Sequence, residues 1–291
     1  TYLKQLGFNV DYAPVADVLT NPDNTVIGTR SFGSDASVVA DMVTKELEGL
    51  SSQGVFGVVK HFPGHGDTSD DSHKTLPVVT HDTARLEKYE LLPFRQFIND
   101  GFAGVMVGHL SVPALDNKTK LPASLSPVII DSLLRKQMGF NGLIFTDALE
   151  MKGVSDNESM IVNAVLAGND ILLKPENPLS QVKLVTNAVK NGIIPLQMIE
   201  DRCLRILQYK YCLGLNKSVS VEKRGIAGKL NSVGAEYLNR RLNEQAVTLL
   251  ENKKDILPLK QLDERKIAVV SVGESSETPF QEMVKQYASV T

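Results

Sequence analysis

A dense group of titratable side chains lies in the segment from Lys60 to His73. The segment contains three of the five histidines of the chain and three aspartates: His61, His65, His73, Asp67, Asp70 and Asp71. Asp71 and His73 stand two residues apart, so a carboxylate could hold one imidazole nitrogen and leave the other free to move a proton. This pattern favours a general acid/base dyad. A surface loop in which the same side chains cap turns is the alternative.

The first two histidines of this segment do not predict a metal site. His61 and His65 are four residues apart, the spacing at which paired zinc ligands share one face of a helix. Pro63, Gly64 and Gly66 break any such helix. We therefore predict a site without a metal, and metal binding is the minor alternative.

The elements before and after this segment predict how it is positioned. Residues 54–59 are short, β-branched and bounded by glycine, which is typical of a buried strand. Lys60 and His61 then follow at its carboxyl end, where parallel α/β folds carry their active sites. Further strands are predicted at 8–16, 103–108, 142–147 and 170–174, and helices at 36–53, 83–101, 127–138, 181–191 and 196–214. This alternation predicts a (β/α) barrel.

Three more titratable residues follow predicted strands. Asp17 precedes turn-forming residues, and we interpret it as structural. His109 is interpreted as a structural histidine with satisfied hydrogen bonds. Asp147 is followed three residues later by Glu150, so it could be functional or could form a capping box for a helix, and the residues alone leave both open.

Composition excludes several other classes of protein. With 291 residues, 42% hydrophobic and 22% charged, the chain is an ordinary globular protein. A net charge of −3 and a pI near 6.0 disfavour nucleic acid as a partner. No apolar run has the length of a membrane span. Cys203 and Cys212 lie nine residues apart in one predicted helix, too far for a mutual disulfide.

The segment from Lys60 to His73 closely resembles a signature of glycoside hydrolase family 3, in its β-N-acetylglucosaminidase (NagZ-like) branch, which serves bacterial peptidoglycan recycling and turnover. The resembling string is KHFPGHG, followed four residues later by DSH and then by Leu76 and Pro77. APVAD at 13–17, GTRSFG at 28–33 and FTDALEM at 145–151 also resemble family motifs. The resemblance covers most of residues 8–175.

This resemblance implies the catalytic residues. Asp147 takes the position of the nucleophile, His73 that of the acid/base, and Asp71 that of the residue orienting His73. The family usually has a second aspartate where this chain has Ala148, but that residue is not the nucleophile. Asp147 therefore keeps its implied role.

The same resemblance implies three sugar ligands, Arg30, Lys60 and His61. The ordinary alternatives for two of them are an ion pair between Arg30 and Asp35 and a lysine whose ammonium reaches water at a strand end. With the motif present, we favour the ligand roles.

The predicted function is a retaining exo-β-N-acetylglucosaminidase that releases terminal β-linked GlcNAc, from peptidoglycan fragments, through a covalent glycosyl-aspartate. A histidine suits the acid/base role because it must be protonated in one step and neutral in the next. The carbohydrate is the expected partner and no cofactor is needed. The alternatives are a family 3 β-glucosidase, a GlcNAc phosphorylase and a non-catalytic sugar-binding module. The phosphorylase is considered because a histidine acid/base would repel an anionic acceptor less than a glutamate would.

Five strand candidates are too few for a closed (β/α)8 barrel, which needs eight. We therefore predict residues 1–214 as a partial catalytic TIM-type barrel lacking its N-terminal strands, 215–265 as a linker with a helix, and 266–291 as the start of an α/β sandwich domain. The missing N-terminal part of the barrel is then an expected partner, and residues 1–291 alone should aggregate or unfold without cooperativity. The bacterial periplasm or cell envelope is favoured over the cytoplasm.

Overall fold

The computed structural model describes residues 2–68, 76–100, 103–117, 121–151, 159–217, 220–273 and 275–290. The chain divides into two compact units, Thr1–Ile226 and Ala227–Thr291. The boundary lies inside the predicted linker 215–265, whose residues therefore belong to both units.

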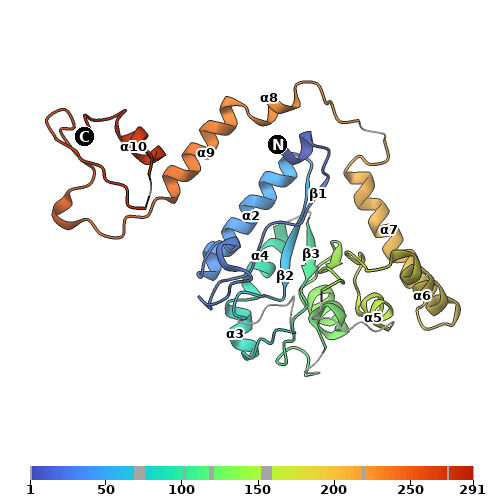
Figure 1. The fold of residues 1–291 in the computed structure, drawn as a ribbon. Helices are drawn as coiled ribbons and strands as arrows, with labels where there is room; N and C mark the ends of the chain where they lie inside the picture. Colours follow the sequence, from blue (N-terminus) through green and yellow to red (C-terminus); the bar gives the residue numbers. More distant parts are fainter. Residues whose placement is uncertain are drawn as a thin grey trace. The chain divides into compact units, whose positions relative to one another are not determined.

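The first unit is built on a parallel sheet (Figure 1). Its strands β1 (Val10–Asp11), β2 (Phe56–Phe62), β3 (Gly104–Val107) and β4 (Ile144–Thr146) pair in the order β1-β2-β3-β4. Ile171 continues the sheet through a parallel bridge to Phe145. All five predicted strand segments thus contribute, in sequence order and all parallel, as in successive βα units of a barrel. In the described part of the chain the sheet stays open between β1 and Ile171.

The outer face of the sheet is covered by helices, of which α2 (Ala36–Ser52) agrees closely with its prediction. Asp35 begins α2, because its Oδ1 accepts hydrogen bonds from the backbone N–H groups of Ser37 and Val38. The buried face of the helix carries Val39 and Val43 onto β2 and α4 (Leu92–Asp100). Local capping and apolar periodicity therefore determine this element.

The predicted helix at 83–101 is wrong as a single element. The structure has α3 (Thr83–Lys88) and α4, separated by a turn at Tyr89–Leu91. Glu90 lies in that turn, is 1% exposed and pairs with Arg85, with 2.7 Å between Oε2 and Nη1. Pro93 has no N–H to donate backwards and fits only the first turn of a helix, so α4 starts afresh around it.

Three longer helices complete the first unit: α5 (Ser159–Ala167), α6 (Pro178–Lys190) and α7 (Leu196–Cys212). The predicted helix at 127–138 is present as η3 (Val128–Gln137), but with π-helical hydrogen bonding. The short helices are α1 (Tyr2–Gln5), η1 (Gly28–Arg30), η2 (Ala123–Leu125) and, across the boundary of the units, α8 (Ile226–Leu230). Cys203 and Cys212 are both free. No helix of the described residues is long and apolar enough to cross a membrane.

Asp170 precedes Ile171 of the sheet and binds side chains of η3 and α7. Its carboxylate is fully buried and lies 2.5 Å from Nη2 of Arg135 and 2.5 Å from Nη1 of Arg205. It also accepts the backbone N–H of Ile144 at 2.8 Å. Removing one member of such a group leaves an uncompensated buried charge.

Asp170→Ala should therefore lower the free energy of unfolding of the full-length protein by about 3–5 kcal/mol. Thermal or urea unfolding measures the change. Asp131→Ala is the matched control, because that carboxylate is 48% exposed and pairs with Lys136 on the surface. Its loss should change the stability by less than about 1 kcal/mol. Equal destabilisation by the two substitutions would contradict the role of Asp170.

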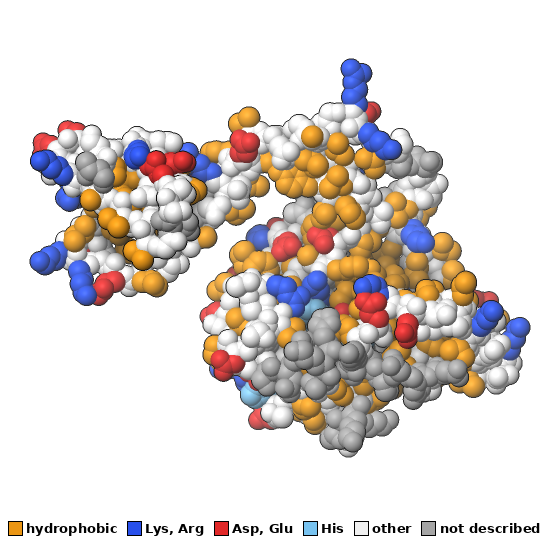
Figure 2. Space-filling model, in the orientation of Figure 1, with side chains coloured by type: hydrophobic (Ala, Val, Ile, Leu, Met, Phe, Trp, Pro, Cys, Tyr) orange, Lys and Arg blue, Asp and Glu red, His pale blue; other side chains and the backbone are white. Residues whose placement is uncertain are grey.

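The second unit contains α9 (Val233–Ala246), η4 (Lys253–Asp255) and α10 (Pro279–Val284). Ile267 pairs in parallel with Val290, and α10 lies between them in the sequence. This strand-helix-strand order supports the prediction of an α/β beginning at 266–291, which stays a prediction. Hydrophobic side chains are exposed along α9, where Val233 is 81% and Leu242 61% exposed (Figure 2).

Candidate active site

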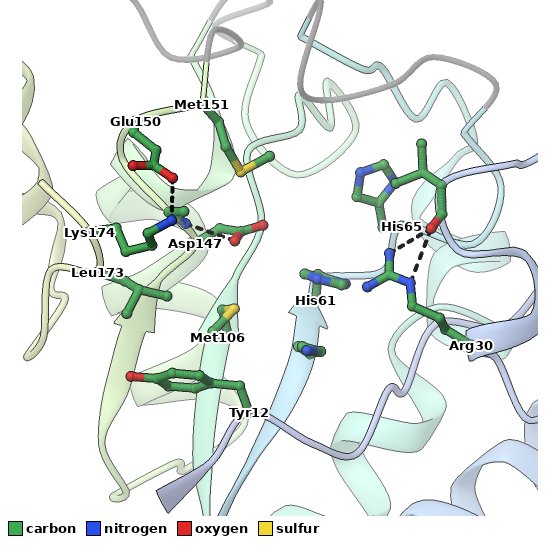
Figure 3. Close-up of a pocket in the computed structure, with 13 residues that line it drawn as sticks. Tyr12, Arg30, His61, His65, Met106, Asp147, Glu150, Met151, Leu173 and Lys174 are labelled. Atoms are coloured by element: carbon green, nitrogen blue, oxygen red, sulfur yellow. Dashed lines mark hydrogen bonds and ion pairs between the residues drawn. The ribbon is translucent and has the colours of Figure 1, made fainter. Parts of the chain in front are cut away.

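A pocket of about 680 Å³ opens at the carboxyl ends of the strands (Figure 3). Four of the six predicted site residues line it: Arg30, Lys60, His61 and Asp147. Tyr12 and Met106 form its floor, and Glu150 and Lys174 stand on the same side as Asp147. The tertiary fold therefore gathers residues that the sequence spreads over more than a hundred positions.

Lys60 and His61 belong to the end of β2, which runs to Phe62 rather than stopping at residue 59 as predicted. Alternate residues of a strand face the same side, so Lys60 follows Phe56 and Val58, which pack in the interior cluster with Met106. Burial lowers the pKa of Lys60, and the charge of Arg30 acts in the same direction. The carboxylates of Asp147, Asp17 and Asp11 oppose this shift.

The sequence indicated that Asp17 forms a turn, but in the structure its carboxylate binds His61 and His65. Its side chain is completely buried, and its Oδ2 lies 2.7 Å from Nδ1 of His61. Its Oδ1 accepts the backbone N–H groups of His61 at 3.2 Å and His65 at 2.7 Å. Burial by itself would raise the pKa of Asp17, but its interactions with His61 and His65 outweigh burial and hold that pKa below its ordinary value.

Arg30 ends η1 and reaches the wall of the pocket. Its Nε and Nη2 donate to the backbone oxygen of Val26 at 3.1 and 2.6 Å, which fixes the guanidinium plane (Figure 3). The alternative ion pair with Asp35 does not form, because the Asp35 carboxylate caps α2 instead.

Asp147 follows β4 directly and faces the pocket across from His61 and Arg30 (Figure 3). Its backbone N–H donates to the oxygen of Val107 at 2.9 Å, and its Oδ1 accepts the N–H of Ala148 at 2.7 Å. The alternative capping box with Glu150 is not present in the described residues. Residues 148–151 are not helical, and Glu150 pairs with Lys174.

His109 lies outside the pocket lining, as the structural interpretation expected. It is fully buried, its Nδ1 lies 2.7 Å from Oγ of Ser124, and its Nε2 lies 3.1 Å from the oxygen of Ala148. Burial lowers the pKa of His109. Its described contacts support the backbone next to Asp147.

The other two predicted site residues, Asp71 and His73, lie outside the described residues. Their dyad stays a prediction from the sequence. Among the described residues no group of three or more His, Cys, Asp or Glu side chains has an arrangement that could hold a metal ion.

Two further residues line the pocket, His65 and Lys174, and the sequence assigned neither of them a role in the site. His65 is 2% exposed, and its Nδ1 lies 2.6 Å from Oγ1 of Thr68. Burial lowers the pKa of His65. Lys174 adopts a left-handed backbone with φ 44°, and its ammonium pairs with Glu150 at the rim. The histidine spacing could have indicated His65, whereas no local pattern indicates Lys174.

A parallel α/β sheet with acids and bases collected at the carboxyl ends of its strands is the architecture of a TIM-type barrel enzyme. Residues 2–209 match the model of the glycosyl hydrolase family 3 N terminal domain, and the chain belongs to this family. The predicted family and fold class are thereby confirmed.

Several known proteins are similar to this chain. Beta-hexosaminidase A of Pseudoalteromonas piscicida is 40% identical over 186 residues, which are 60% of this chain and 31% of that protein. Beta-hexosaminidase LpqI of Mycobacterium tuberculosis is 38% identical over 220 residues, 72% of this chain and 55% of that protein. The chain thus spans about a third to a half of these relatives.

Solved structures agree with this assignment. A family 3 beta-N-acetylglucosaminidase from Paenibacillus sp. superposes with a TM-score of 0.83 and 33% identity, over 99% of this chain and 57% of that chain. The beta-glucoside phosphorylase BglX also superposes with a TM-score of 0.83, but at 24% identity this likeness shows the fold alone.

Proposed function

We propose that the protein to which this chain belongs is a retaining exo-β-N-acetylglucosaminidase that releases terminal β-linked GlcNAc. The observation that carries the proposal is that Asp147 faces Arg30, Lys60 and His61 in one pocket. The names of the similar hexosaminidases support the same substrate class. Peptidoglycan fragments are the proposed natural source of the sugar, by the resemblance to the NagZ-like branch.

In the proposed first step, a carboxylate oxygen of Asp147 attacks the anomeric carbon. The bond to the leaving oxygen breaks, and that oxygen takes the proton of His73. In the second step His73 accepts a proton from water while the water oxygen displaces Asp147 from the sugar. Asp71 would hold His73 through one ring nitrogen and leave the other to carry the proton.

The described pocket suits an uncharged sugar. Lys60 and Arg30 carry only hydrogen-bond donors, and sugar hydroxyls can accept from them. Among the described residues, the side chain of Asp147 accepts one hydrogen bond, at Oδ1 from Ala148 at 2.7 Å, and we propose that Oδ2 attacks the sugar. Hydrogen bonds from charged donors are stronger than those from neutral ones, which would fix the ring above the nucleophile.

One observation favours a second candidate, phosphorolysis. Three cationic side chains, Arg30, Lys60 and Lys174, line the pocket. A phosphate acceptor would gain from this charge, and a histidine acid/base would repel it less than a glutamate would.

We also propose that further strands of the same protein close the sheet between β1 and Ile171. Val10 and Tyr12 at one edge and Ile171 at the other are only partly buried, although they pack on the interior cluster. Closure would bury them and pair the exposed backbone groups of the two edges.

The full-length protein should turn over nitrophenyl β-GlcNAc at least about tenfold faster than nitrophenyl β-glucose, because only the first carries the acetamido group of the proposed substrate. Initial rates with and without phosphate, together with identification of the sugar product, measure this. Free GlcNAc is the expected product. Faster turnover of the glucoside would favour the β-glucosidase. Formation of a sugar 1-phosphate would favour the phosphorylase. No turnover of either substrate would favour the binding module.

A further inference from the structure

We propose that Asp17 is a positioning residue of this active site. It holds His61 in the tautomer with the proton on Nδ1, so that Nε2 accepts a hydrogen bond from a hydroxyl of the bound sugar. The inference rests on the proposed glycosidase function and adds to it a specific recognition of one hydroxyl group.

The first support is the direction of the hydrogen bond between the two side chains. Oδ1 of Asp17 already accepts two backbone N–H groups, from His61 at 3.2 Å and from His65 at 2.7 Å. Oδ2 lies 2.7 Å from Nδ1 of His61 in a fully buried setting. An ionised carboxylate has no proton to donate, so Nδ1 must be the donor.

The charge state of Asp17 agrees with this direction. Burial raises the pKa of Asp17, but the hydrogen bonds with the His61 ring and the His65 backbone N–H lower it, and the pKa lies below its ordinary value overall. The carboxylate is therefore ionised at neutral pH, and Oδ2 is an acceptor there.

The second support is the position of the His61 ring. His61 is 6% exposed and lines the pocket. Its ring also packs edge-on against the ring of His65, with 5.9 Å between the centroids. With Nδ1 turned to Asp17 and a neighbouring ring at its side, Nε2 is the atom that His61 can offer to a bound molecule (Figure 3).

The third support is complementarity with the neighbouring cations. Lys60 and Arg30 can only donate hydrogen bonds, whereas a sugar hydroxyl both donates and accepts. An acceptor beside them satisfies the hydroxyl proton. A site built to pair both functions of a hydroxyl rejects an analogue that lacks it, because the protein groups are then left unpaired.

The test is Asp17→Asn in the full-length protein. The two backbone N–H donors keep the amide oxygen of the new side chain in the Oδ1 place, so its NH2 group faces Nδ1 of His61. Nδ1 must then accept a hydrogen bond, and the ring proton moves to Nε2. The same change of tautomer occurs in serine proteases when asparagine replaces the aspartate of the catalytic triad. Nitrogen-15 NMR of labelled histidine should show Nδ1 protonated in the native protein and Nε2 protonated in the variant.

The same substitution should lower kcat/KM on nitrophenyl β-GlcNAc by roughly 10- to 100-fold, mainly through KM, because one buried hydrogen bond to substrate is lost. Substrates deoxygenated at one hydroxyl at a time locate the contact. For the analogue lacking the contacted hydroxyl, the kcat/KM values of the native protein and the variant should agree within about threefold. The substitution and the removal of the hydroxyl abolish the same hydrogen bond, so their effects are not additive.

Asp116→Asn is the matched control. Asp116 is also a buried carboxylate, 7% exposed, accepting from Oγ of Ser126 at 2.6 Å, but it does not line the pocket. It should leave the His61 tautomer and the deoxy-substrate pattern unchanged.

Nε2 protonated in the native protein would overturn the proposal, and this measurement needs no variant to fold. An unchanged tautomer in Asp17→Asn, or an equal loss on every deoxygenated substrate, would overturn it as well. If the native protein does not turn over the GlcNAc substrate, the proposed function fails, whereas the NMR result still decides the tautomer.

Discussion

Replacing Asp147 with asparagine in the full-length protein should lower turnover of nitrophenyl β-GlcNAc by several orders of magnitude. A neutral amide cannot attack the anomeric carbon, so the covalent intermediate would not form. The fold should be retained. Among the described residues, the side chain of Asp147 accepts a hydrogen bond from the N–H of Ala148 at 2.7 Å, which an asparagine oxygen can also accept.

Steady-state kinetics and a thermal unfolding curve measured on the same preparation separate lost chemistry from lost structure. Asp131→Asn serves as the control, since its exposed carboxylate pairs with Lys136 away from the pocket and its activity should stay near that of the native protein. Near-native turnover by Asp147→Asn would remove Asp147 from the mechanism.

His73→Ala should reduce turnover by roughly 10²–10⁴-fold on substrates with poor leaving groups, which need a proton to depart. The first step on activated nitrophenyl substrates should be affected much less, because nitrophenolate leaves without a proton. The second step still needs the base, so a burst of nitrophenol followed by slow turnover is expected, with the glycosyl-enzyme visible by intact mass spectrometry.

One further variant tests the partner of His73, and another serves as a control. Asp71→Ala should show the same pattern more mildly, because Asp71 only orients and tunes the ring. His81→Ala should show little effect: His81 pairs with Asp67 at 2.6 Å, yet neither residue lines the pocket. Equal losses by His73→Ala on both substrate types would contradict the proton-donor role.

Much of the scaffold could be predicted because its signals are local. The β-branched segment before Lys60 forms β2, and Asp35 begins α2 through contacts with residues two and three positions away. The alternation of such elements was enough to predict a parallel barrel. The family motif also indicated Arg30, Lys60, His61 and Asp147, which one pocket brings together.

The remaining features depend on partners that are distant in the sequence. The helix predicted at 83–101 is broken in the structure, where Glu90 is buried against Arg85, and periodicity does not reveal which side chain the turn will bury. Lys174 meets Glu150 only because the segment of Ile171 pairs beside β4.

Asp17 is the clearest case. By its neighbours it is a turn residue, and nothing within several positions of it predicts a buried carboxylate. The parallel bridge between Val15 and Lys60 brings Asp17 beside His61, 44 residues along the chain. Residue types and short spacings thus determined which chemistry the chain could carry. The register between strands decided which carboxylate meets which imidazole, because that contact is made across the sheet and not along the chain.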